Sequence, residues 1–257
     1  MLTDNNLLKL MTWNSPNFPI GSFVYSHGLE YSVEIGLVND QPSLVNWIEG
    51  IILFGSGRVD ASLLKAAYTA FEKENYSLLN KIVERADTQK STKEFSMESK
   101  TQGSAFLKTL IKICPNSKLD IWENNLEKIK REPAFPVSFG VACSIFNIPM
   151  RQSILVFLNS IVSNLVSAGI RLIPLGQIAG QKSIISLEEV IIKATSKAMK
   201  RDIEDFGSAA LVVDWTSMKH ETQYTRLFRS LNILFALESA YLLDQVRPLF
   251  WKSCALI

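Results

Sequence analysis

Apolar residues recur at helical spacing along most of this chain, and this pattern constrains its fold more than any other feature. In residues 43–60 the apolar side chains on one broad helical face are Leu44, Trp47, Ile48, Ile51 and Ile52. Glycine and proline break helices, yet only 12 glycines and 9 prolines occur in 257 residues. Alternating strand patterns are scarce. The sequence therefore predicts an all-α protein.

The segment 151–173 is apolar around more than half of its helical circumference, which is typical of a helix surrounded by others. It stops before Pro174, because the residue before a proline disfavours the helical conformation. We therefore expect a single-domain bundle of about ten helices around this central buried helix. Asn159 and Arg171 interrupt the segment, so it falls short of the ~18 uninterrupted apolar residues of a membrane span.

Charge and cysteine content exclude several classes of protein. The chain has 27 basic and 25 acidic side chains, a balance that gives no basic patch for nucleic acid. Its three cysteines (Cys114, Cys143 and Cys254) are far apart, which argues against a disulfide framework. The N-terminus lacks the pattern of a signal peptide. We expect a cytoplasmic protein that binds neither nucleic acid nor a membrane.

Polar residues mark three predicted helix starts. Ser26 is a plausible N-cap for a helix that follows it. The spacing from Ser91 to Glu94 is that of a capping box, in which a hydroxyl and a carboxylate bind free amides at the helix end. Ser186 opens a segment with acidic residues in its first turn and Lys200 and Arg201 at its end, so both ends complement the helix dipole.

Few residues suit catalysis or metal binding. The chain has two histidines, and no cluster of histidines and cysteines has metal-ligand spacing. Neither a GxSxG elbow nor a phosphate-binding loop ending in Lys-Ser or Lys-Thr occurs. Cys143 lies among apolar residues and is typical of a packed core thiol. The sequence predicts no catalytic residue and no metal site within the chain, while a site shared across a symmetric dimer stays open.

Three segments are unusual. In residues 15–38, Phe18-Pro19-Ile20-Gly21 predicts a rigid turn into a helix, where His27 and Glu30 are three residues apart and able to pair. Spacing favours a structural role over a binding site. Residues 173–182 fit either a helix–helix corner or an exposed interaction surface. Residues 218–230 predict an amphipathic helix, either docked on its own bundle or, since arginine stands beside aromatic residues, forming a protein interface.

These three segments, in this order, resemble the UreF family of urease accessory proteins, over about residues 5 to 230. In the first motif the residues that match are Phe18, Pro19, Gly21, Ser26, Gly28, Leu29 and Glu30. In the second they are Pro174, Leu175, Gln177, Gly180 and Gln181, with Lys182 adjacent. In the third they are His220, Glu221, Tyr224, Arg226, Leu227 and Phe228.

The resemblance implies an all-helical, cytoplasmic, dimeric protein that is not itself an enzyme. UreF proteins bridge UreD (also called UreH) and the nickel-carrying GTPase UreG, and together these load nickel into the urease apoprotein. The complex handles nickel, and the chain alone binds no cofactor. By this resemblance the second and third motifs are expected to bind partners, and Tyr224, Arg226 and Phe228 are expected to be the main contacts with UreD. The first motif is expected to be structural.

The chain departs from the family at its C-terminal end. We expect residues 1–230 to form the UreF-like helical domain, whereas residues 231–257 form an apolar extension. That extension is expected to be a docked helix, a second interaction stripe or, the option we favour, a weakly ordered tail. Two rival functions stay open: an enzyme that uses His27 and Glu30 as an acid/base pair, and a stand-alone helical scaffold or regulator unrelated to urease.

Overall fold

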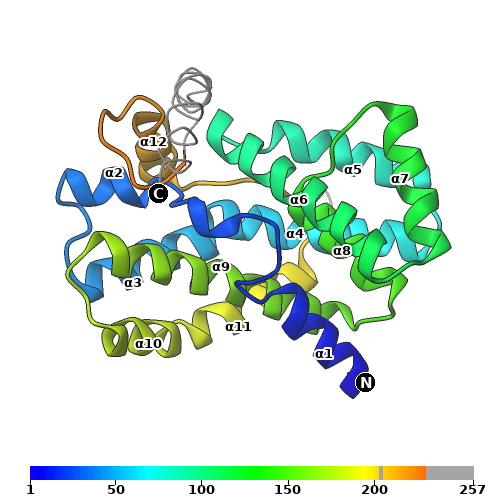
Figure 1. Cartoon of the computed structure of the whole chain (residues 1–257), viewed down its shortest axis with the longest axis horizontal. Coiled ribbons are helices and arrows are strands. Elements are labelled where there is room, and N and C mark those ends of the chain that lie inside the picture. The colour runs from blue at the N-terminus through cyan, green and yellow to red at the C-terminus, as the bar shows by residue number, and fades with distance from the viewer. Residues whose placement is uncertain (203–204, 230–257) are drawn as a thin grey trace, which may run out of the picture.

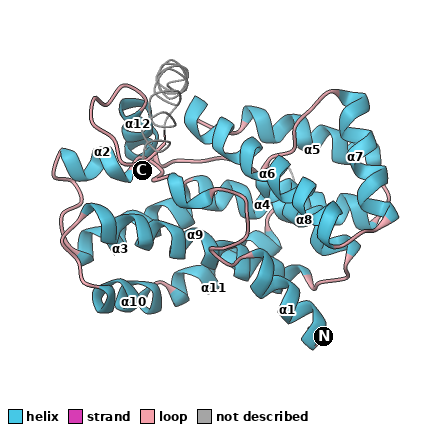
Figure 2. Ribbon diagram, in the orientation of Figure 1, coloured by secondary structure: helices cyan, strands magenta, loops and turns pink. Residues whose placement is uncertain are grey.

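The computed structural model describes residues 1–202 and 205–229, and the predicted extension 231–257 lies outside the described residues. The described residues contain helices and no strand, which confirms the all-α prediction (Figures 1 and 2). The α-helices are α1 (Asp4–Trp13), α2 (Leu29–Glu34), α3 (Gln41–Phe54), α4 (Ser56–Glu72), α5 (Tyr76–Thr88), α6 (Lys93–Ile113), α7 (Ser117–Ile129), α8 (Phe135–Ile145), α9 (Met150–Leu172), α10 (Gln177–Ser186), α11 (Glu188–Lys200) and α12 (Leu211–His220), with a 3-10 helix, η1, at Ser22–Val24.

The most completely buried helix in the described part of the chain is α8, which packs against α4 and α6 (Figure 1). All of its residues except Ser144 are buried. Helix α4 lies very close, since a Cβ on Gly140 would be 2.5 Å from the carbonyl oxygen of Leu64. Helix α9, which covers the segment expected to be the central helix, packs against α2, α3, α4, α8, α10 and α11, but it is less completely buried than α8.

By length and composition, α9 is the one helix in the described part of the chain that is long and apolar enough to cross a membrane. Half of its most apolar window is buried inside the bundle. Its buried positions include Ile154, Phe157, Leu158 and Val162. A core helix passes the same length and composition test, and packing against α4, α10 and α11 accounts for the apolar character of α9.

An aromatic cluster fixes the first sequence motif to the core. Its rings belong to Trp13, Phe18, Phe106, Phe135, Phe139 and Phe157, and the centroids of contacting pairs are 5.4–6.2 Å apart. Edge-to-face and tilted pairs of this kind add to the stabilisation from burial. Because the Phe18 ring packs on Phe106 of α6, the turn that follows it at Pro19–Gly21 is anchored to the core.

The three predicted helix starts differ from the observed ones. Helix α2 begins after Gly28, whose φ of 74° places it in the left-handed region, so Ser26 is not the N-cap. Helix α6 is capped by Thr92, whose hydroxyl accepts from the Phe95 amide, and no capping box forms because Glu94 turns toward another helix. Ser186 ends α10, and Leu187 separates it from α11.

The predicted helix over residues 218–230 is also wrong, because α12 ends at His220. Residues 221–229 follow an irregular path back along α2. The backbone amides of Leu227 and Phe228 donate to the Glu30 side chain, and the amide of Arg229 donates to the carbonyl of Val24. These long-range hydrogen bonds replace those that a continued helix would make.

Candidate functional site

A buried histidine connects the first and third sequence motifs. His220 lies at the end of α12, between Glu30 of α2 and Glu94 of α6. Its Nε2 is 2.9 Å from a Glu30 carboxylate oxygen, and its Nδ1 is 2.8 Å from a Glu94 carboxylate oxygen. All three side chains are buried. Because both ring nitrogens face carboxylates, both donate, and the imidazole carries a positive charge.

The two glutamates determine the protonation of His220. Burial by itself lowers the pKa of His220, but the hydrogen bonds to Glu30 and Glu94 and their negative charges outweigh it and raise the pKa to about 9. Burial raises the pKa of Glu30, while its hydrogen bonds with His220 and with the amides of Leu227 and Phe228 lower it, for a net decrease. The network is therefore charged at neutral pH.

Glu30 also holds the C-terminal part of the described chain. Its Oε1 accepts from the Leu227 amide at 2.6 Å, and its Oε2 accepts from the Phe228 amide at 3.0 Å. Backbone donors bound to a buried carboxylate form strong, charge-assisted hydrogen bonds. One side chain of the first motif thus fixes the path of the third.

Gly28 lets α12 approach α2 closely enough for these contacts. A Cβ at Gly28 would lie 2.5 Å from the Thr216 hydroxyl and 2.8 Å from the Ser217 amide nitrogen. Its positive φ is also costly for any residue with a side chain. The glycine is required at this position by both space and backbone conformation.

Gly28→Ala should lower the free energy of unfolding by about 2 kcal/mol through left-handed strain and overlap with α12. Urea unfolding followed by circular dichroism measures this loss. Gly36→Ala is the matched control, because its φ is similarly positive (77°) but its Cβ would meet nothing within 4 Å. Equal losses in the two variants would show that α12 does not press on Gly28.

Arg171, in the last turn of α9 just before the second motif, contacts residues of the first and third motifs. Its guanidinium carbon lies 3.7 Å from the centroid of the Phe23 ring and 4.3 Å from that of the Phe228 ring. It also donates to the carbonyl of Phe23 at 3.0 Å. Arginine between two aromatic faces combines cation–π attraction with apolar packing. The corner between α9 and α10 is thereby fixed to residues near both Glu30 and His220.

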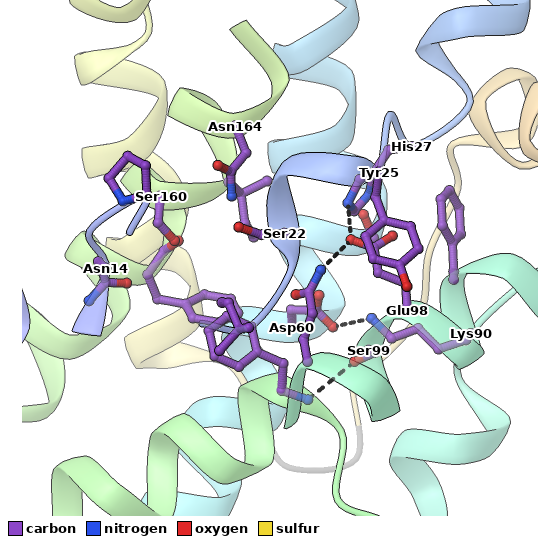
Figure 3. A pocket seen from close by; sticks show the side chains of 18 of the residues that line it. Asn14, Ser22, Tyr25, His27, Asp60, Lys90, Glu98, Ser99, Ser160 and Asn164 are labelled. Atoms are coloured by element: carbon purple, nitrogen blue, oxygen red, sulfur yellow. Dashed lines mark hydrogen bonds and ion pairs between the residues drawn. The ribbon is translucent and has the colours of Figure 1, made fainter. Parts of the chain in front are cut away.

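A second polar cluster lines a pocket between the first motif, α4 and α6 (Figure 3). His27 lies 3.0 Å from Glu98, which also accepts from Gln102 at 2.8 Å. Lys90 and Asp60 form a buried ion pair at 2.5 Å in the same pocket. Burial lowers the pKa of His27, but the charge and hydrogen bond of Glu98 outweigh it, for a net increase.

The predicted pairing of His27 with Glu30 is wrong, and so is the acid/base pair that depended on it. His27 precedes the first residue of α2 and has a φ of 51°, so the three-residue helical spacing does not apply to it. It turns to Glu98, whereas Glu30 turns to His220. His27 is thus held by Glu98 of α6, whereas His220 is held by Glu30 of α2 and Glu94 of α6.

The residues predicted to bind partners divide by exposure. Exposed side chains are those of Gln177, Gln181 and Lys182 on α10, and of Tyr224 and Leu227. Buried or half-buried ones are His220, Phe228, Glu221 and Arg226. Arg226 donates to the carbonyls of His220 and Glu221 at the end of α12. His220 and Phe228 are thus corrected from surface contacts to internal ones, since ion pairs hold His220 inside and the Arg171 guanidinium packs on the Phe228 ring.

The motif residues predicted to be structural are mostly internal. Buried are Phe18, Ser26, Gly28, Leu29 and Glu30; Pro19 and Gly21 are exposed in the turn. Sequence reasoning missed Glu94, Glu98 and Arg171. A signal for the two glutamates exists, because their four-residue spacing places both on one face of α6 together with buried Phe95 and Gln102.

In the described ranges 1–202 and 205–229, no group of three or more histidine, cysteine or acidic side chains is placed to hold a metal ion. Burial raises the pKa of Cys143 to about 12, so this thiol stays protonated and unreactive. The fold and site define an all-helical protein in which buried charged side chains connect α2, α6 and α12. Exposed polar and apolar side chains lie on α10, α12 and the segment after α12.

Comparisons with known proteins agree with this class. The UreF family model matches residues 38–188, more than half of the chain. A protein of Magnetococcus marinus named "Urease accessory protein UreF" is 36% identical over 237 residues, covering 90% of this chain and 100% of that protein. Proteins of the same name from Rhodopseudomonas palustris (strain BisB5) and Bradyrhizobium diazoefficiens are 38% and 37% identical, covering 88% and 87% of this chain and 91% of each relative. The chain belongs to the UreF family.

Proposed function

We propose that this chain is a urease accessory factor that supports nickel insertion into the urease apoprotein. Membership of the UreF family is the observation that carries the proposal. In it the chain acts as an adaptor between UreD (UreH) and the GTPase UreG, without catalysis of its own. The complex handles the nickel, and the chain alone binds no cofactor. It works in the cytoplasm as a homodimer, with neither nucleic acid nor a membrane as partner.

Differential binding is the mechanism we propose for the adaptor. A protein that binds one nucleotide state of a GTPase more tightly than the other shifts the population toward that state. Such action needs rigid binding surfaces and no reactive side chains. The buried network supports it, because Glu30 and His220 hold the third motif in one conformation before any partner binds, which lowers the entropic cost of association.

The UreD-binding surface in this proposal centres on the segment after α12. Tyr224 is fully exposed and Leu227 is 74% exposed, although the backbone beside them is fixed by Glu30. Large exposed apolar or aromatic side chains on a rigid backbone are typical of interface anchors. Gln177, Gln181 and Lys182 on α10 form the second proposed surface.

Replacing both Tyr224 and Leu227 by alanine should weaken binding to UreD about tenfold or more, because two exposed anchors are lost. Titration calorimetry or surface plasmon resonance with purified UreD measures the change. Met11→Ala removes a similarly exposed apolar side chain from α1 and should leave the affinity unchanged. An unchanged affinity in the double variant would place the UreD contact elsewhere.

Urease activation in cells tests the function as a whole. Cells lacking this chain should produce urease apoprotein with little bound nickel, and the wild-type gene should restore the metal content. Co-purification of the chain with UreD and UreG tests the adaptor role separately. Normal nickel loading without the chain would reject the proposal, and failure to bind either partner would favour the stand-alone scaffold.

A further inference from the structure

The pocket between the first motif, α4 and α6 has polar walls whose side chains hold one another in place (Figure 3). In one wall Glu98 lies 3.0 Å from the Nε2 atom of His27 and accepts from Gln102 at 2.8 Å. In another wall Lys90 and Asp60 form their buried ion pair. Because these side chains have partners within the walls, the pocket is formed before any molecule enters it.

Three polar atoms that line this pocket are buried and have no hydrogen-bond partner among the described residues. They are Oδ1 of Asn14, Nδ1 of His27 and the hydroxyl oxygen of Ser56. Buried polar atoms in folded proteins nearly always have a partner, which is either the protein or a bound molecule. The amide oxygen accepts, the hydroxyl donates and accepts, and the imidazole nitrogen donates when it carries a proton. A molecule that satisfies these atoms therefore needs both donors and acceptors.

The charges that line the pocket cancel one another. His27 pairs with Glu98, and Lys90 pairs with Asp60. An ion that entered would lose its hydration without gaining an unpaired counter-charge, so the lining favours a neutral molecule. The space open to the centre of a water-sized sphere is about 50 Å³. One bound water needs ~10–15 Å³ of such space, so the pocket has room for about three to five non-hydrogen atoms.

Aromatic rings complete the lining and offer apolar contacts beside the polar ones. Phe135 and Phe157 both line the pocket, and their ring centroids are 5.4 Å apart. The lining reaches the surface at the turn of the first motif, where Pro16 is exposed and Ser22 is half-buried. A small molecule with one apolar group thus has both a route from solvent and a surface on which to pack that group.

We propose that this pocket binds a small neutral amide of about four non-hydrogen atoms, which carries a carbonyl acceptor and an N–H donor. The N–H group donates to an acceptor such as Asn14 Oδ1, and the carbonyl accepts from a donor such as the Ser56 hydroxyl. An alkyl substituent packs on the phenylalanine rings. This site is separate from the proposed partner surfaces on α10 and after α12, so it stands independently of the proposed function.

Acetamide, compared with acetate, tests the proposal on the full chain. The two molecules have nearly the same shape, but acetate is an anion and has no hydrogen-bond donor. Saturation-transfer NMR of their methyl protons measures both affinities. We expect a dissociation constant of about 1 mM for acetamide, which is reasonable for so few atoms, and binding of acetate at least ~tenfold weaker. Equal affinities, or no acetamide binding at about 50 mM, would overturn the proposal.

Two variants of Ser56 and a matched control locate the bound molecule. Ser56→Leu places a larger apolar side chain in the pocket and should weaken acetamide binding at least ~tenfold. Ser117→Leu should leave binding unchanged, because Ser117 is exposed and begins α7 just as Ser56 begins α4. Ser56→Ala removes only a hydroxyl without a partner in residues 1–202 and 205–229, so it should keep the fold and weaken binding about threefold or more. Unchanged affinity in either Ser56 variant would overturn the proposal, since acetamide would then bind elsewhere.

Discussion

Replacing His220 by leucine should lower the free energy of unfolding by about 3–5 kcal/mol, the usual cost of removing one partner from a buried ion pair. Leucine is apolar, so Glu30 and Glu94 would remain buried without the cation between them. The amides of Leu227 and Phe228 still neutralise part of the charge on Glu30. Glu94 has less compensation, because its remaining contact in the network is the Ser217 hydroxyl at 3.3 Å.

Urea unfolding of the purified chain measures this loss, and two further variants assign its cause. Adding Glu30→Gln and Glu94→Gln to His220→Leu removes both carboxylate charges and should restore part of the stability. His220→Gln keeps a hydrogen-bond donor and should cost less than leucine. A loss below about 1 kcal/mol for His220→Leu would mean that the glutamates are solvated or protonated once the histidine is gone.

The helical class of the fold could be predicted from the sequence because it depends on local patterns. The apolar residues from Leu44 to Ile52 lie in α3, and the long apolar segment 151–173 corresponds to α9. The rank of α8 as the most buried helix could not be predicted from apolar content alone. It depends on Gly140 allowing the α4 backbone to approach, which is a property of two helices together.

The ends of helices were predicted less well, because tertiary contacts compete with local capping. Glu94 has the right spacing for a capping box, yet it binds His220 from 126 residues away. Residues 221–229 have helical spacing, yet Glu30 takes two of their backbone amides. In both cases a buried carboxylate gains more from a distant partner than from the local pattern that the sequence displays.

The candidate site illustrates the same limit. His27, Glu30 and His220 were all singled out from the sequence, and His27 was expected to pair with Glu30. In the structure His27 pairs with Glu98, and Glu30 pairs with His220. A single residue, Gly28 in the left-handed conformation, ends any helical relation between His27 and Glu30. Residue type therefore indicated which side chains belong to the candidate site, whereas backbone conformation determined which of them pair with each other.

The network also explains why the three sequence motifs occur together. Gly28 and Glu30 belong to the first motif, Arg171 precedes the second, and His220 and Phe228 belong to the third. In the structure these residues form one connected set through the Glu30 and Arg171 contacts. The two proposed partner surfaces are thus connected by a short series of contacts through α9 and the segment after α12.

Raising the pH from about 6.5 to about 9 should destabilise the fold by about 3 kcal/mol through His220 alone. The pKa of His220 rises from 6.5 to about 9 on folding, so the folded chain holds a proton that the unfolded chain releases. The stabilisation is complete below pH 6.5 and is lost as the pH rises through 9. His27 contributes in the same direction, because its pKa is also raised.

Unfolding free energies measured at intervals between pH 6 and pH 10 test this dependence. The difference between the wild-type chain and His220→Gln isolates the histidine from His27, lysines and tyrosines, since those groups titrate in both chains. That difference should be largest below pH 6.5 and should shrink as the pH approaches 9. A difference independent of pH would mean that His220 is neutral in the folded chain, and one of its two glutamates would then have to carry the proton, because a neutral imidazole cannot donate to both.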